Sequence, residues 1–287
     1  MRFVRTLREK RRNPVVPLLW ALTCALALAL MGLLAALVPV VHVHDSATLQ
    51  GFVVLDQPRV APVADFVAHL ADPLPYALIG LALAAVAAAR RRLSVALAIP
   101  PLLVATEVTT QLLKQLLAHP RFDEWLGASQ IPAASWPSGH ATAAMTLALC
   151  AVIAAPAALR PLAAFAGGAF AIAVSYAILV LGWHFPSDVL GGYLVAGMWM
   201  SLAVASLSWL ERRCPREEGE AARPIPVRVV GVPAAAGGLA AAAVIVLTRP
   251  EVVRVHALDR PTFVVGALAI AALAVGMAAG LSRALRA

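Results

Sequence analysis

Long apolar runs, broken by clusters of arginine, dominate this chain of 287 residues. Several runs approach 20 residues, the length that an α-helix needs to cross the hydrocarbon core of a bilayer. Inside a membrane the backbone N–H and C=O groups find no water, and a helix satisfies them within its own segment. Only 13% of the residues are charged, against about 25% in a typical soluble domain. We therefore predict an all-α, polytopic membrane protein.

Eight apolar segments are long enough for us to interpret them as spans. They cover residues 15–41, 74–89, 94–117, 138–157, 162–182, 186–209, 229–247 and 262–282. The first is too long for the apolar core of a cleaved signal peptide, which has about 7–15 residues. Apolar residues recur among polar ones in the loop at 42–72, and this pattern predicts an amphipathic helix on the outer membrane surface.

The basic residues indicate the orientation, because cytoplasmic segments carry an excess of Lys and Arg. With both termini placed in the cytoplasm, the outer side and its adjacent helix ends hold only six of the 23 basic residues: Arg59, Lys114, Arg121, Arg249, Arg254 and Arg260. The net charge of +8 therefore reflects topology. We expect no nucleic-acid partner, because the chain offers no soluble face for a basic patch.

A change of composition at residues 211–228, where charged residues gather, is the clearest boundary in the chain. We divide the sequence into an N-terminal part (1–73, a basic segment, the first span and the outer loop), a core (74–210) and a C-terminal part (211–287, a cytoplasmic loop and two accessory spans). The three cysteines give no disulfide framework, and the seven histidines lack zinc-ligand spacing. We expect neither a metal nor another cofactor.

Three short polar clusters lie at the edges of apolar runs in the core. They are Lys114 to Arg121, the sequence Pro-Ser-Gly-His at 137–140, and His184 to Asp188. The predicted topology places all three on the outer face. Ionisable side chains at membrane depth are costly and mark functional sites by default. We therefore predict that the clusters form one pocket at the outer membrane surface.

The first two clusters are suited to holding an anion. A span that begins at Ser138 places Gly139 and His140 in its first turn, where backbone N–H groups lack partners and the helix dipole is positive. Ser138 caps the helix or donates its hydroxyl to a phosphate oxygen, and Gly139 allows that oxygen to approach the backbone. Lys114 adds a point charge and Arg121 a planar fork, both suited to a phosphoryl group.

The third cluster is suited to nucleophilic catalysis. His184 and Asp188 lie four residues apart at the start of a helix, a spacing that allows the carboxylate to fix the imidazole tautomer. The other ring nitrogen is then free to act as a nucleophile. His140 is the natural proton donor to the leaving oxygen. Cationic side chains and helix N-termini can neutralise the developing charge without a metal.

Taken in order, the clusters resemble the three-part signature of the type 2 phosphatidic acid phosphatases, also called lipid phosphate phosphatases. Lys114 and Arg121 have the spacing of the first motif, K-x-x-x-x-x-x-R-P, the second motif P-S-G-H is complete, and His184 and Asp188 match the end of the third, S-R-x-x-x-x-x-H-x-x-x-D. The resemblance covers about residues 74–209 and implies a six-helix core. It also implies that His184 forms a phosphohistidine with support from Asp188, that His140 protonates the leaving group, and that the phosphate oxygens are held by four residues: Lys114, Arg121, Ser138 and Gly139.

The chain departs from this signature in two of the three motifs. Phe122 stands where the first motif has proline, and the Ser-Arg pair of the third motif falls on Ala177 and Ile178. A phosphate-binding arginine is therefore missing from the third motif. Loss of a charge-assisted contact costs about 1.5–3 kcal/mol, so a slow, altered or inactive member of the family stays an open reading.

The resemblance implies hydrolysis of a lipid phosphate, on the extracytoplasmic side of the cell membrane, in contact with membrane lipids. Candidate substrates are polyprenyl phosphates and diphosphates, phosphatidic acid and phosphatidylglycerol phosphate. Two alternatives stay open: a phosphotransferase that uses His184 with another acceptor, and a degenerate member that binds a lipid without turnover. The sequence leaves the lipid and the oligomeric state undetermined.

Overall fold

A computed structural model describes residues 14–213 and 258–285, and within these ranges every regular element is a helix. The predicted all-α class is therefore confirmed. The α-helices are α2 (Val15–Leu37), α3 (Pro39–Val53), α4 (Ala61–His69), α5 (Pro73–Ala89), α6 (Leu93–Leu116), α7 (Gly139–Ala154), α8 (Arg160–Val180), α9 (Pro186–Arg213) and α12 (Pro261–Ala284). Two short 3-10 helices, η1 (Glu124–Leu126) and η2 (Ala157–Leu159), lie in the connections.

Five of the described helices are long and apolar enough to cross a membrane: α2, α6, α8, α9 and α12. The pair α4 and α5, bent by 55° at its break, adds a sixth if it forms one span. The predicted span at 138–157 corresponds to α7, a shorter apolar helix. The predicted span at 229–247 lies outside the described residues, as does the basic segment at 1–13. A total of eight spans, with both termini inside, stays a prediction.

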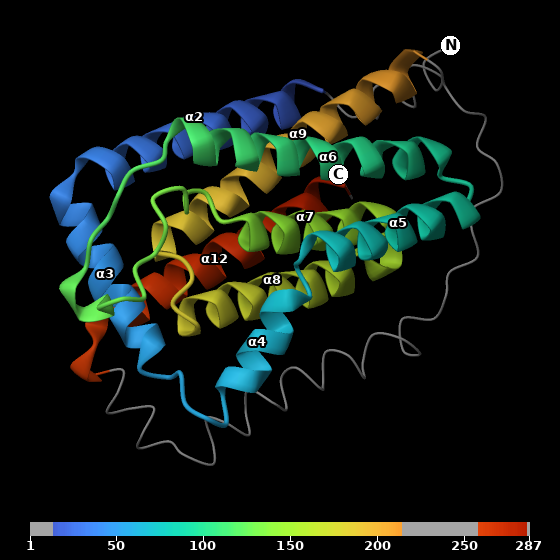
Figure 1. Cartoon of the computed structure of the whole chain (residues 1–287). Coiled ribbons are helices and arrows are strands. Elements are labelled where there is room, and N and C mark those ends of the chain that lie inside the picture. The colour runs from blue at the N-terminus through green and yellow to red at the C-terminus, as the bar shows by residue number, and fades with distance from the viewer. Residues whose placement is uncertain (1–13, 214–257, 286–287) are drawn as a thin grey trace, which may run out of the picture.

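Helix α7 runs through the middle of the bundle (Figure 1) and is buried along almost its whole length. It packs against α8, α9, α6 and α5, whereas α2 lies on α9 and α12 lies on α8. Small residues allow these close contacts: a Cβ on Gly167 of α8 would lie 2.8 Å from the Cα of Ala148 in α7. Such close approach of backbones is typical of helix pairs in membranes.

The residues expected to form an outer loop at 42–72 form two helices instead. The first span ends at Leu37, earlier than expected, because Pro39 cannot continue the hydrogen-bond ladder of α2. Helix α3 then packs against α8, α9 and α12 and buries Phe52, so it is not an amphipathic helix on the membrane surface. Helix α4 does keep apolar side chains exposed, with Val63 at 61% and Phe66 at 67%.

The last helix belongs to the same bundle. In α8, Tyr176 donates a hydrogen bond to the carbonyl of Ala267 at 2.7 Å, and Arg160 donates to the carbonyl of Leu285 at 2.5 Å. At its other end, α12 accepts a hydrogen bond from Thr48 of α3 at the carbonyl of Thr262 (3.2 Å). These bonds join α12 to the core at both ends.

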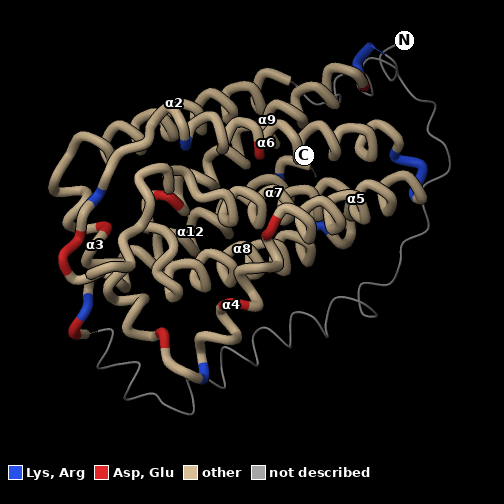
Figure 2. The backbone as a smooth tube through the Cα atoms, viewed as in Figure 1, with Lys and Arg blue, Asp and Glu red and all other residues tan. Residues whose placement is uncertain are grey.

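Charged residues separate toward the two ends of the bundle. Figure 2 shows acidic residues gathered at the end where α3 and α4 lie, and basic residues where α5 meets α6 at the opposite end. The turn between α5 and α6 holds Arg90, Arg91 and Arg92. The bundle therefore has one end richer in acids and one richer in arginine.

The contact between α7 and α9 generates a prediction for stability. A Cβ on Gly192 would lie 2.7 Å from the carbonyl oxygen of Ser138 and 2.9 Å from the backbone nitrogen of Thr142. Because neither backbone atom can give way easily, Gly192→Ala should destabilise the fold by about 1–3 kcal/mol. The measurement is thermal unfolding of the purified protein in detergent.

Gly276→Ala is the matched control, because a Cβ at this position of α12 meets nothing within 4 Å. Alanine favours helix over glycine, so this variant should unfold at the wild-type temperature or slightly above it. Equal unfolding temperatures for the two variants would show that α7 and α9 do not approach as closely as described.

Candidate active site

The three polar clusters of the sequence meet at one end of the bundle (Figure 1). Lys114 lies in the last turn of α6, and Arg121 follows in the loop between α6 and α7. Ser138, Gly139 and His140 form the start of α7. His184 precedes α9, and Asp188 lies in its first turn. The structure thus brings together all the residues that the sequence singled out.

The starts of α7 and α9 are joined by their backbones. Ser138 is the N-cap of α7, where its hydroxyl accepts a hydrogen bond from the N–H of Ala141 at 3.3 Å. This satisfies one of the backbone donors that a helix start leaves open. The N–H of Ser138 donates to the carbonyl of Asp188 at 2.9 Å. The second and third motifs are therefore held at a fixed distance.

His184 and Asp188 form a close pair on the inner side of the site. The Nδ1 atom of His184 lies 3.4 Å from Oδ2 of Asp188, which also accepts the N–H of Phe185 at 3.0 Å. Asp188 is fully buried and His184 is 8% exposed. A carboxylate at Nδ1 favours the tautomer with its proton there. This leaves Nε2 of His184 with a free lone pair.

His140 faces His184 across the site. The two ring centroids are 6.3 Å apart, and the Nε2 atom of His140 lies 3.1 Å from Oδ1 of Asp72. Both side chains of this second pair are partly exposed. The two imidazoles therefore lie close enough to act on one and the same group.

Lys114 lies beside the first turn of α7. Its Nζ atom would be 3.7 Å from a Cβ on Gly139, the only atom within 4 Å of that position. Across the described parts of the chain, no hydrogen bond or ion pair engages this ammonium. The cation and the open backbone of Gly139 are both available to an anion between the histidines.

Arg121 is the most fully engaged group of the site. Its Nη2 atom donates to Asp188 Oδ1 at 2.5 Å and to the hydroxyl of Ser135 at 2.7 Å. Its Nη1 atom donates to the hydroxyl of Ser187 at 3.2 Å and to Asp45 Oδ2 at 3.4 Å. The guanidinium also lies over the ring of Phe185, 4.1 Å from its centroid, and its side chain is only 7% exposed.

Asp45, on α3, is a site residue that sequence reasoning missed. Its carboxylate accepts the N–H of Ser187 at 3.0 Å and also the hydroxyl of that serine. Burial raises the pKa of Asp45 to about 6, helped by the nearby Asp188 carboxylate and opposed by Ser187 and Arg121. Asp45 sits in the segment expected to be a loop, where an acid carries no signal of burial.

Asp72, the partner of His140, was also missed, although the sequence contains a signal for it. Asp72 precedes Pro73, the first residue of α5, and an acid followed by proline is typical of a helix start. Ser187 lies within the third cluster and Ser135 just before the second, and the sequence assigns no role to either. Ile178, at the position of the missing arginine, is fully buried in the apolar core.

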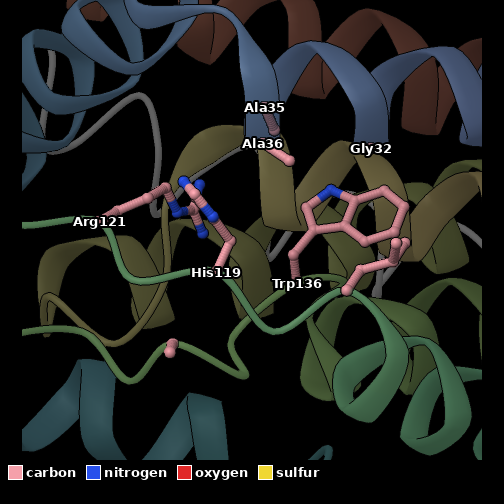
Figure 3. A pocket seen from close by; sticks show the side chains of 8 residues that line it. Gly32, Ala35, Ala36, His119, Arg121 and Trp136 are labelled. Atoms are coloured by element: carbon pink, nitrogen blue, oxygen red, sulfur yellow. The ribbon is translucent and has the colours of Figure 1, made fainter.

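A shallow pocket lies behind Arg121, between α2 and the loop that leads to α7 (Figure 3). Its lining consists of Gly32, Ala35, Ala36, Leu117, His119, Arg121, Ala133 and Trp136, around about 260 Å³ of empty space that is partly open to solvent. Trp136 fills the gap between α2 and α9: Cβ atoms on Gly32 and Gly191 would lie 2.7 and 2.9 Å from its ring. The indole thus separates this pocket from the helices behind it.

Among residues 14–213 and 258–285, no group of three or more His, Cys, Asp or Glu side chains is arranged to hold an ion. The cations close to the histidines in this part of the chain are Lys114 and Arg121.

Arg121 generates a second prediction for stability. Arg121→Met removes the cation and leaves the carboxylates of Asp45 and Asp188 buried without it. Removing one partner of a buried ion pair costs about 3–5 kcal/mol, so this variant should unfold at a much lower temperature in detergent. Arg59→Met, at an exposed position, is the control and should unfold as wild type does. Equal stability of the two variants would contradict the buried network.

Comparisons with known proteins agree with this architecture. Residues 92–213 match the family model of the PAP2 superfamily. No curated protein sequence matches the chain. A similar solved structure is the crystal structure of a transmembrane PAP2-type phosphatidylglycerolphosphate phosphatase from Bacillus subtilis, with 21% identity, a TM-score of 0.50, and coverage of 67% of this chain and 98% of that one. The matched segment includes every predicted site residue but neither Asp45 nor Asp72. The chain is thus a multi-pass membrane protein, and its residues 92–213 are similar to the PAP2 superfamily.

Proposed function

We propose that the protein is a lipid phosphatase that removes phosphate from a lipid headgroup through a phosphohistidine intermediate. The observation that carries this proposal is the pair of imidazoles with ring centroids 6.3 Å apart, each held by its own carboxylate. The match of residues 92–213 to the PAP2 superfamily supports the reaction class.

In the first step, Nε2 of His184 attacks phosphorus, and an N–P bond replaces the P–O bond to the lipid. His140 gives its proton to the leaving oxygen, which departs as the lipid alcohol. In the second step a water molecule attacks the phosphohistidine, His140 takes its proton, and inorganic phosphate leaves. Asp188 holds the Nδ1 proton of His184 throughout and stabilises the positive charge on the ring.

The developing negative charge on phosphate is met by Lys114 and by the first turn of α7. The Nζ atom lies close to Gly139, where the absence of a side chain leaves the backbone open. Preorganised donors of this kind stabilise a transition state without reorganisation. The proposed mechanism requires no metal ion.

A lipid substrate fits the surroundings of the site. Helix α4 exposes apolar side chains, including Val63 and Phe66. The next helix, α5, begins directly after Asp72, the partner of His140. A phosphate monoester carries less negative charge than a diphosphate, and Arg121 is already paired with two carboxylates, which leaves Lys114 to meet the charge of the substrate. We therefore place phosphatidic acid, phosphatidylglycerol phosphate and polyprenyl phosphate first, and polyprenyl diphosphate second.

The extracytoplasmic face is the proposed location of the site. The arginine-rich end of the bundle lies opposite the acid-rich end at α3 and α4 (Figure 2), and arginine is enriched on the cytoplasmic side of membrane proteins. A substrate in the outer leaflet of the cell membrane would then reach the histidines without crossing the bilayer.

His184→Ala tests the proposed nucleophile. Phosphate release from a panel of lipid monoesters and diphosphates, measured in detergent with EDTA, should fall to background, because the proposed phosphoenzyme forms on this side chain. His44→Ala, at an exposed position of α3, should keep wild-type activity. A wild-type enzyme inactive on the whole panel, or inactive only when EDTA is present, would refute the proposal. Transfer of labelled phosphate to an added alcohol measures the phosphotransferase alternative in the same assay.

His140→Ala tests the proposed proton donor. Activity on a lipid phosphate should fall by about 10²–10⁴-fold, the usual contribution of general acid catalysis. An aryl phosphate, whose leaving group needs no proton, should be cleaved with a much smaller loss. An equal loss on both substrates would show that His140 acts in binding rather than in proton transfer.

A further inference from the structure

Arg121 has no hydrogen to spare on its terminal nitrogens. Its two Nη atoms make four hydrogen bonds, to Asp188, Ser135, Ser187 and Asp45, and four is the number of N–H groups that these atoms carry. A phosphate therefore gains the planar fork of this guanidinium only if one of the four acceptors releases it.

Asp45 is the acceptor that competes most directly with a phosphate and is held least closely. Its distance from Nη1 is 3.4 Å, against 2.5 Å between Nη2 and Asp188. Asp188 also supports His184, and Ser135 and Ser187 are neutral, so neither competes with phosphate as an anion does. Asp45 carries a charge of the same sign as the phosphate.

We propose that Asp45 is a positioning residue that holds Arg121 in the empty site and yields it to the substrate phosphate, becoming protonated as the phosphate binds. The proposal rests on the proposed function only in taking a phosphate group as the ligand. No other residue outside 92–213 contacts Arg121 among the described hydrogen bonds. Through Asp45, the N-terminal part of the chain would thus set the affinity of the site for phosphate.

The charges around Asp45 support this exchange. Burial and the carboxylate of Asp188 raise its pKa, whereas Ser187 and Arg121 lower it, and the resulting pKa is about 6. On its own helix, His42 faces Asp123 of the outer loop at 3.6 Å, and His44 is exposed. An incoming dianion would raise the pKa of Asp45 further, because a like charge disfavours ionisation.

The helices packed on α3 bring little other charge to Asp45. Helix α2 contains no ionisable side chain except Cys24, and α9 brings Asp188. Arg160 of α8 and Arg283 of α12 lie at the far ends of those helices, where Arg160 bonds the carbonyl of Leu285. Arg260 caps the near end of α12. The proton is taken from solvent, and the new O–H can donate to the hydroxyl of Ser187.

The expected pH dependence follows from the sign of the shift. The raised pKa means that Asp45 is protonated below about pH 6 and charged above it. If binding requires the protonated form, the apparent affinity falls with the protonated fraction. Anion binding should therefore be tighter at pH 5.5 than at pH 7.5 by about tenfold or more.

Sulfate is the probe, because it stays a dianion across this pH range and is not turned over. Its binding to the full-length protein in detergent is measured by calorimetry at several pH values. Asp45→Asn removes the charge but keeps an acceptor for the N–H of Ser187. At pH 7.5 this variant should bind sulfate about tenfold more tightly than wild type, and most of the pH dependence should disappear.

Asp56→Asn, at an exposed position after α3, is the matched control and should bind sulfate as wild type does. The second variant is Ser187→Ala, which removes a hydrogen bond that lowers the pKa of Asp45. It should shift sulfate binding in the same direction by a smaller factor, and it keeps the test valid if Asp45→Asn does not fold.

Sulfate affinity in Asp45→Asn that is unchanged or weaker at pH 7.5, with the wild-type pH slope, would overturn the proposal. The result is independent of turnover. A protein that binds sulfate as expected but hydrolyses no lipid would disprove the proposed function and leave the role of Asp45 intact. If the protein hydrolyses lipid but Asp45→Asn binds sulfate as wild type does, the proposed function stands and the role of Asp45 is disproved.

Discussion

The buried guanidinium of Arg121 is the interaction on which the site depends. A cation taken out of water is costly unless its partners are well placed, and here two carboxylates and two hydroxyls surround it. These partners come from α3, the loop between α6 and α7, and α9. Because the cation cannot be left unpaired, all three segments are held at fixed positions around it, and Asp188 is fixed in the orientation that it needs at His184.

The scaffold brings the reacting groups together through backbone contacts. Small residues allow α7 and α9 to approach until the N–H of Ser138 reaches the carbonyl of Asp188. Two helix starts then lie side by side, and each brings the positive end of its helix dipole to the site. Precision of this kind is easier to obtain from helix ends than from flexible loops, since the ends are fixed by packing along the whole helix.

The sequence allowed much of this arrangement to be predicted, because apolar runs and cationic clusters have strong physical causes. A run of about 20 apolar residues has few alternatives to a membrane helix, and the three motifs, placed on one face by the predicted topology, indicate that His140, His184 and Asp188 are neighbours. The roles assigned to those residues stay predictions. Even so, the contacts among them agree with the roles.

The contribution of α3 was not predictable in the same way. Periodicity reports burial for apolar residues, whereas Asp45 is an acid among polar neighbours, and its burial depends on a cation 76 positions away. The break at Pro39 was visible in the sequence, but the direction in which the chain continues after it depends on tertiary packing. The seventh predicted span, at 229–247, lies outside the described residues and stays a prediction.

The missing arginine of the third motif and the presence of Asp45 both reduce the positive charge that the site offers to a phosphate. With Ile178 buried in the core, the described site has two cations, Lys114 and Arg121, and the carboxylates of Asp45 and Asp188 offset them. An incoming phosphate dianion therefore brings charge that the site does not balance at rest. A third cation would remove that deficit, and so does a proton on Asp45. Loss of one arginine is thus tolerable only where a nearby carboxylate can be neutralised at moderate cost, which is the property that burial gives to Asp45.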